Sequence, residues 1–176
     1  MNKSNPVVLV NIFKEIVNNM RVYKPDNSLY TLNYQPGREL NILKDLSDKD
    51  NSNTFQDLKY PLIAMIIPDV EQRDVVGFYA KVTIPQIVIA ALSNGTDDIL
   101  TRYSDTGNFL TVLYPCYYEF LNQIARHPNI IVQDPGTIKH KKVDSPGVAP
   151  KGLSDYVDII YINQLEIQLI ETQKPC

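Results

Sequence analysis

Hydrophobic positions between residues 58 and 92 form two neighbouring strand-like segments, and we expect the rest of the chain to be organised around them. The first segment, residues 62–67, is continuously apolar and is stopped by Pro68. The second alternates, with one set of residues on each face: Phe78, Ala80, Val82 and Ile84 against Tyr79, Lys81 and Thr83. A continuous run is typical of a strand buried on both faces, and an alternating run of a strand with one solvated face. Because consecutive strands usually pair, we predict a central antiparallel ribbon, with Pro85 at a bulge or an edge.

Two other segments have the periodicity of amphipathic helices. The first begins at Pro6, which suits a first helical position, and ends near Arg21. The second begins near Phe109 and ends at His127, because the residue before a proline is pushed out of the α region. Pro115 must lie in the first turn of that helix or kink it, since an interior proline costs about 3 kcal/mol.

The segment from residue 23 to residue 57 is irregular and rich in turn residues. We interpret residues 29–34 and 39–46 as the two strands of a short hairpin. Residues 47–53 are too polar to be buried, so we expect a surface loop there.

A second irregular segment, residues 129–152, is predicted to be a long loop. A loop of roughly twenty residues inside a compact domain is uncommon and is usually functional or disordered. It carries a basic cluster and apolar residues, which we interpret as a candidate inter-subunit arm: Lys139, His140, Lys141, Lys142, Val143 and Val148. A solvated surface is the ordinary interpretation of such lysines, and a contact to a phosphate backbone is a further alternative.

Residues 156–171 alternate regularly and predict a long closing strand with one apolar face: Val157, Ile159, Tyr161, Leu165, Ile167 and Leu169. Asn163 interrupts this face and indicates a bulge or a switch of sheet. We therefore expect an α+β fold, in which two main helices pack on an antiparallel sheet with long loops. Residues 1–176 form one domain, with irregular insertions at about residues 23–57 and 129–152. The residues predicted to be buried together are Leu62, Ile63, Ile66, Val82, Ile84, Leu113, Leu121, Leu165 and Ile167.

Composition is that of an ordinary globular domain, with 44% hydrophobic and 21% charged residues in a chain of 176. The net charge of -3 makes no electrostatic case for a nucleic-acid binder or a membrane surface. Polar residues interrupt the apolar run near the N-terminus, so we predict neither a signal peptide nor a membrane span. Two distant cysteines, Cys116 and Cys176, fit a reducing cytoplasm without a disulfide framework.

The sequence contains no pattern typical of catalysis. It has no glycine-rich phosphate loop, and His127 and His140 lie outside known metal-binding spacings. Cys116 is expected to be a small core residue, because His127 would lie about three helical turns away. The close carboxylate pairs are expected to be solvated: Asp97 with Asp98, and Asp155 with Asp158. We therefore predict no enzyme activity, no cofactor and no metal.

Three stretches resemble neck or tail-completion proteins of crAss-like and other Bacteroides-type phages, which form rings between portal and tail. They are YPLIAMIIP (residues 60–68), VLYPCYYEFLNQI (residues 112–124) and LSDYVDIIYINQLEIQLIE (residues 153–171). Their order is also similar to the tail-terminator fold of tailed phages. The resemblance covers most of the chain and implies a structural virion protein of the neck or tail, made in the host bacterial cytoplasm.

The resemblance also implies partners: a homo-oligomeric ring of six or twelve copies, the portal or adaptor, other neck or tail proteins, and genomic DNA that passes without sequence-specific binding. A ring requires a heterologous interface whose rotation closes, and long loops and strand edges commonly supply one. One alternative is a hexameric tail terminator that caps a long tail tube. Another is a small non-catalytic ligand-binding α+β domain.

Overall fold

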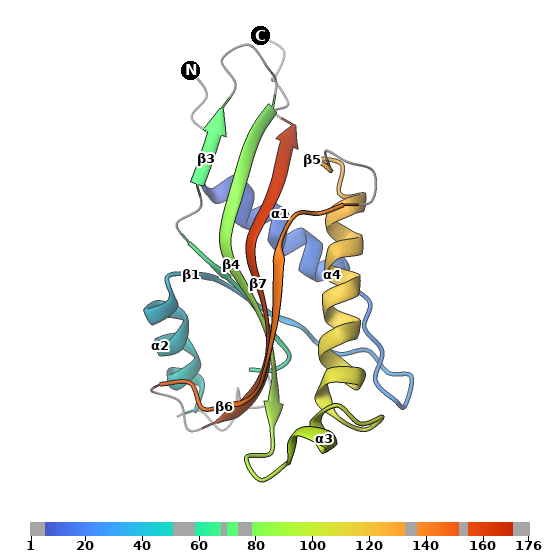
Figure 1. The fold of residues 1–176 in the computed structure, drawn as a ribbon. Coiled ribbons are helices and arrows are strands. Elements are labelled where there is room, and N and C mark those ends of the chain that lie inside the picture. The colour runs from blue at the N-terminus through green and yellow to red at the C-terminus, as the bar shows by residue number, and fades with distance from the viewer. Residues whose placement is uncertain are drawn as a thin grey trace.

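The computed structural model describes residues 6–50, 59–67, 70–73, 79–132, 137–151 and 155–170. A curled, mostly antiparallel sheet carries helices on both faces, in agreement with the α+β expectation (Figure 1). Along the chain the elements are α1 (Pro6–Asn19), β1 (Asn33–Gly37), α2 (Glu39–Asp50), β2 (Leu62–Ile66), β3 (Val70–Arg73), β4 (Tyr79–Ser93), α3 (Ile99–Arg102), the π-helical turn η2 (Phe109–Leu113), α4 (Tyr114–Arg126), β5 (Ile130–Ile131), β6 (Lys141–Val148) and β7 (Tyr156–Ile170).

The sheet is built around the two long strands, β4 and β7, which pair antiparallel along their full length. On its other side β4 pairs first with β3 and then with β2, while β7 pairs with β5 and β6. The predicted antiparallel ribbon is therefore confirmed, but its register differs from the simplest expectation. β2 pairs with residues 86–90, because β3 occupies the place beside residues 80–83.

In β4 and in β7, the alternation of side chains between the two faces of the sheet shifts by one residue at the same level. Strict alternation would place Ile84 and Ile87 on opposite faces, yet both contact the main core. Pro85 is thus an extra residue in β4, and Gln164, with a left-handed φ of 54°, is the extra residue in β7. The two lie opposite each other, so the register continues without a shift from Ile84 with Leu165 to Gln86 with Asn163.

This change corrects the predicted face of the last strand. Val157 and Ile159 pack in a second cluster, whereas Leu165 and Ile167 belong to the main core on the other face. The interruption expected at Asn163 lies one residue later, at Gln164, because that residue adopts the left-handed conformation.

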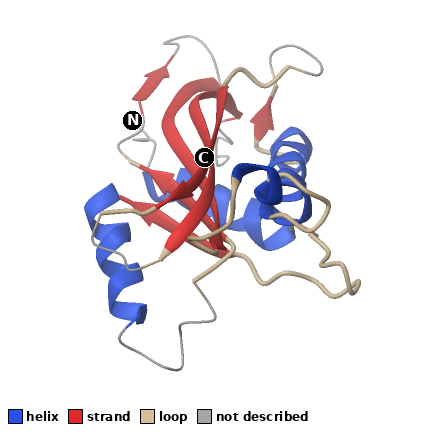
Figure 2. Ribbon diagram, turned by 60° about the horizontal axis from the view of Figure 1, so that its bottom comes forward, coloured by secondary structure: helices blue, strands red, loops and turns tan. Residues whose placement is uncertain are grey.

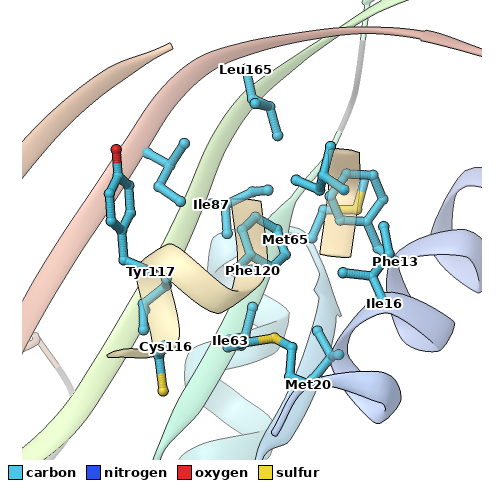
Figure 3. Close-up of a cluster of buried hydrophobic side chains, with 14 of the residues drawn as sticks. Phe13, Ile16, Met20, Ile63, Met65, Ile87, Cys116, Tyr117, Phe120 and Leu165 are labelled. Atoms are coloured by element: carbon cyan, nitrogen blue, oxygen red, sulfur yellow. The ribbon is translucent and has the colours of Figure 1, made fainter. Parts of the chain in front are cut away.

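The main core lies between one face of the sheet and helices α1 and α4 (Figure 3). Phe13 of α1 and Phe120 of α4 meet there with ring centroids 5.9 Å apart. The predicted core is confirmed for these residues: Ile63, Val82, Ile84, Leu113, Leu165 and Ile167. Leu121 is only partly buried at its edge.

The second cluster lies on the opposite face, beneath α2, and contains Ile42, Leu46, Leu62, Ala64, Ala90, Val157 and Ile159. Leu62 belongs to this cluster and Ile66 packs against it, so the prediction of one common core was wrong for both. Because the sheet is apolar on both faces, a helix is needed on each (Figure 2).

Helix α2 also replaces the predicted hairpin. Residues 39–46 are helical, and β1 pairs in parallel with β2. Ile42 and Leu46 are one helical turn apart and bury the same side of α2 against the sheet. Residues 47–50 complete this helix rather than a loop, while residues 51–53 and Phe78 lie outside the described part of the chain.

Helices α1 and α4 agree with the sequence prediction. Pro115 lies in the first turn of α4, directly after the wider turn η2. α4 ends at His127, whose ψ of 128° is extended, before Pro128.

Replacing Leu165 tests the placement of β7. Leu165 is fully buried, so Leu165→Ala is expected to lower the free energy of unfolding by about 2–5 kcal/mol through lost burial and a residual cavity. Leu40 is 80% exposed on α2, so Leu40→Ala is expected to change that free energy by less than about 0.5 kcal/mol. Urea unfolding followed by circular dichroism measures both, and equal effects would contradict the assigned register.

Candidate assembly surfaces

Strand β6 occupies much of the segment that the sequence predicted as a long loop. Residues 141–148 pair antiparallel with β7, so the loop prediction was wrong there. The segment has little hydrophobic alternation, but main-chain hydrogen bonds to β7 hold it whatever its side chains are. Among the described strands β6 pairs with β7 alone, and a register irregularity between Ser145 and Val148 interrupts it. Lysines and irregularities of this kind protect a free sheet edge from unwanted pairing.

The six residues proposed as an inter-subunit arm all lie on β6 or directly before it. Four are exposed: Lys139, Lys141, Lys142 and Val143. His140 is half-buried, and Val148 packs against the second cluster beneath α2. The structure thus brings the basic residues together along one strand but places Val148 apart from them, partly buried against the second cluster.

Part of the basic cluster is occupied by contacts to α4. The Tyr117 hydroxyl lies 2.7 Å from His140 Nε2, and His140 Nδ1 lies 2.7 Å from the Ile138 carbonyl oxygen. Because a carbonyl can only accept, Nδ1 donates to it and Nε2 accepts from Tyr117 in the neutral imidazole. Lys142 Nζ lies 4.6 Å from the centroid of the Tyr114 ring, a cation–π contact. Lys141 and Val143 therefore remain on the opposite face, paired in register with Asn163 and Tyr161.

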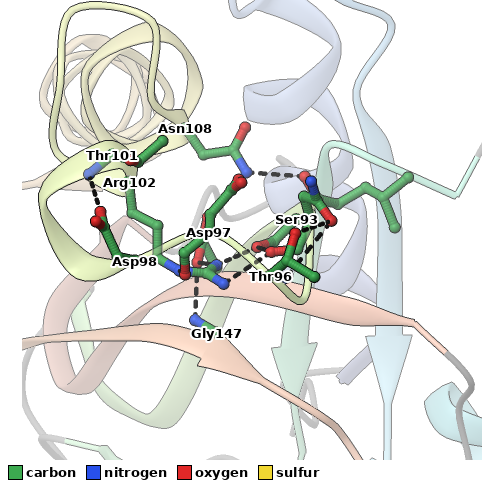
Figure 4. A network of polar contacts seen from close by, with 11 residues as sticks. Ser93, Thr96, Asp97, Asp98, Thr101, Arg102, Asn108 and Gly147 are labelled. Atoms are coloured by element: carbon green, nitrogen blue, oxygen red, sulfur yellow. Dashed lines mark hydrogen bonds and ion pairs between the residues drawn. The ribbon is translucent and has the colours of Figure 1, made fainter.

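A buried arginine organises the end of the sheet where α3 lies (Figure 4). Arg102 is only 6% exposed, and its Nη1 lies 2.5 Å from Asp158 Oδ1. Its Nε donates to the Asp97 carbonyl at 3.1 Å and its Nη2 to the Asn94 carbonyl at 2.8 Å. Nη1 also contacts Ser93 Oγ. These bonds fix the turn between β4 and α3.

Asp158 completes this network from β7 and is 1% exposed, so the prediction that it is solvated was wrong. It accepts hydrogen bonds from the Gly147 amide at 2.8 Å and from Asn108 Nδ2 at 2.9 Å. Gly147 has a φ of 64°, and a Cβ there would lie 3.1 Å from Arg102 Cζ, so glycine is required at this position.

Asp155, the other predicted surface carboxylate on this segment, forms an ion pair with Lys59, which is 1% exposed. Sequence reasoning missed both buried cations because nothing near Lys59 or Arg102 distinguishes them from surface residues. Asp98 is exposed as expected and caps α3, since its carboxylate accepts from the Thr101 amide at 2.7 Å. The hydrogen bond from the Thr101 amide lowers the pKa of Asp98.

An apolar groove lies between α2 and the second face of the sheet, with a cavity volume of about 100 Å³. Ala64, Val88 and Tyr161 lie side by side across its floor on β2, β4 and β7. Two walls are formed by Leu43 of α2 and by Pro150 beyond β6.

Large apolar side chains are exposed at the end of the molecule where α3 lies. We call this group the end patch: Leu92 (56% exposed), Ile99 (61%), Leu100 (79%) and Tyr156 (47%). Leu92 and Tyr156 belong to the paired ends of β4 and β7, and α3 is held there by Arg102. Exposed apolar groups that gather in one region are typical of an interaction surface.

The described residues contain no group of three or more histidine, cysteine, aspartate or glutamate side chains that could hold a metal ion. Within the same part of the chain, no helix is long and apolar enough to cross a membrane. Cys116 is fully buried in the main core, as predicted. Comparison with family models, with curated proteins and with solved structures finds no match to the chain.

The buried ion pair gives a stability test. Asp158→Asn leaves Arg102 buried without a counter-charge, and the free energy of unfolding is expected to fall by about 3–5 kcal/mol. Adding Arg102→Met should recover part of the loss, because no buried charge is then left. Asp105→Asn, at an exposed position, is the control and is expected to change nothing. Chemical unfolding measures the free energy of all three variants. An unchanged free energy of unfolding in Asp158→Asn would show that the network does not stabilise the fold.

Stability is expected to fall at high pH. Burial raises the pKa of Cys116 from its ordinary 9.0 to about 12, and it raises the pKa of Tyr34 well above its ordinary 10.0. The unfolded state therefore loses these protons first, so their contribution is complete below about pH 9 and is lost as pH rises toward 12. Tyr34→Phe should flatten this loss in urea titrations taken between those values. An unchanged pH dependence in Tyr34→Phe would contradict this assignment.

Proposed function

We propose that this protein is a structural virion subunit of a tailed phage, which forms a ring in the neck or tail, connects the portal to the tail and lines the DNA conduit. The observation that carries the proposal is that the domain has two unlike apolar surfaces, the groove beneath α2 and the end patch around α3. Two unlike, separate surfaces are what a heterologous ring contact needs.

The sequence resemblance supports the same proposal. The three stretches that resemble phage neck proteins contain β2, most of α4 and β7, and these elements are packed together at the centre of the fold. Because the three stretches pack against one another, the resemblance concerns the core of the fold, and it supports the proposal better than unconnected segments would. We propose a tail-terminator-like domain in a ring of six or twelve copies, next to the portal or adaptor and other neck or tail proteins.

The charge is consistent with this role. A net charge of -3 gives the subunit no general attraction for DNA, so genomic DNA can pass without being held. The protein would be made in the host bacterial cytoplasm and function in the virion. A hexameric terminator at the end of a long tail tube is the closest alternative and would use the same surfaces.

A second candidate function is a small non-catalytic ligand-binding domain. The groove favours it, because its apolar lining also includes the polar groups of Gln86 and Tyr161. Ligand pockets commonly combine an apolar lining with a few polar groups. This function requires neither self-association nor a place in a virus particle.

Light scattering and negative-stain images of the purified chain, together with mass spectrometry of particles from an infected culture, test the proposal. We expect closed rings in solution, or on addition of the neighbouring neck proteins, and the protein in the particles. A strictly monomeric chain that is absent from particles would contradict a structural role in the virion.

A further inference from the structure

We infer that α3 of one subunit inserts into the groove beneath α2 of the next subunit, with Leu100 as the side chain that enters it. This inference rests on the proposed function, because a ring repeats one heterologous contact between unlike surfaces. It identifies the occupant of the groove as a second copy of this chain.

The inserted element is apolar and firmly held. Leu100 is 79% exposed and Ile99 is 61% exposed, so both side chains extend into solvent in the single subunit. α3 is fixed at its start by the Asp98 cap and at its end by the buried Arg102, which pairs with Asp158 at 2.5 Å. An exposed apolar side chain on a rigid support loses little entropy on binding and gains the full benefit of burial.

The receiving surface is hollow where the floor residues are small. Ala64 and Ala90 lie on β2 and β4 within the lining, and Val88 between them is half-buried. Leu43 of α2 forms the wall on one side, next to the buried Ile42 and Leu46. Most side chains around this space are apolar, so a leucine side chain matches it better than a polar group would.

The charges around the two surfaces are complementary. Asp98 and Asp105 are exposed on either side of α3, while Arg102, the basic residue within α3, is buried and paired. Two exposed lysines lie near the groove: Lys151 follows Pro150 of its lining, and Lys141 pairs with Asn163, two residues from Tyr161 of its floor. Glu39, the carboxylate that lines the groove, lies on the α2 side. An acidic apolar element and a groove with one basic rim attract each other in a defined orientation.

The positions of the two surfaces suit a side-by-side arrangement. α2 and α3 lie on opposite sides of the sheet near the same end of the molecule (Figure 1). A contact between them therefore joins neighbouring subunits laterally and leaves both surfaces of every subunit occupied once the ring closes.

Cysteine cross-linking tests this contact directly. All variants carry Cys176→Ser, and the native Cys116 is buried. Under mild oxidation, a mixture of Leu100→Cys and Val88→Cys proteins is expected to form a disulfide-linked pair. Leu110 is 44% exposed on the neighbouring turn η2, so Leu110→Cys mixed with Val88→Cys is the matched control and is expected to remain unlinked. Equal linking of both mixtures would overturn the inference.

Self-association gives the second test. Leu100→Ala should weaken it about tenfold or more, while Leu110→Ala leaves it unchanged. Lys141→Glu should also weaken it, and a partner protein carrying Asp105→Lys should restore it. Circular dichroism checks that each variant is folded.

The outcomes separate the inference from the proposed function. Rings of Leu100→Ala that match the wild type would overturn the α3 contact and leave the ring proposal standing. A wild-type monomer that is absent from particles would overturn both. A small apolar molecule found in the groove by native mass spectrometry, with Leu100→Ala assembling normally, would overturn the second-copy occupant and favour a ligand site.

Discussion

The long ladder between β4 and β7 is the interaction on which the rest of the structure depends. Both strands carry one extra residue at the same level, Pro85 in one and Gln164 in the other, and the register therefore continues past it. An extra residue in only one strand would slip the register by one and turn half of the apolar side chains toward solvent. The matched pair instead lets one ribbon supply a core beneath α1 and α4 and a second core beneath α2.

Buried charge, rather than apolar packing, positions the elements at the end of this ladder. Arg102 joins the turn after β4 to Asp158 on β7, and Asp158 also holds the amide of Gly147 on β6. A buried ion pair is favourable only when its remaining donors and acceptors are satisfied, and here these polar atoms are bonded. The network holds α3 at its end, and Leu100 of α3 is 79% exposed. In the proposed contact, a side chain held in this way would lose little entropy.

The basic strand β6 has two faces with different roles. His140 and Lys142 contact the tyrosines of α4 and help to hold the strand in place. Lys141 and Val143 belong to the other face and border the groove side of the sheet. Lysines on an edge strand protect it from pairing with other strands, and the same charges can still orient an acidic neighbour. The basic cluster is thus better described as the rim of a surface than as an extended arm.

The sequence by itself determined the elements whose signals are local: α1, α4 with Pro115 in its first turn, and the apolar strands β2 and β7. It also placed the basic residues of the candidate site in one segment, though not in a strand. Only the tertiary structure decided the rest. α2 packs on the second face of the sheet, and β6 pairs with the edge of β7. Both partners are distant in the chain, so a local sequence pattern does not predict these contacts. The face of Val157, the burial of Asp158 and the groove likewise depend on residues distant in the chain, because burial is a property of the packed fold and not of the local sequence.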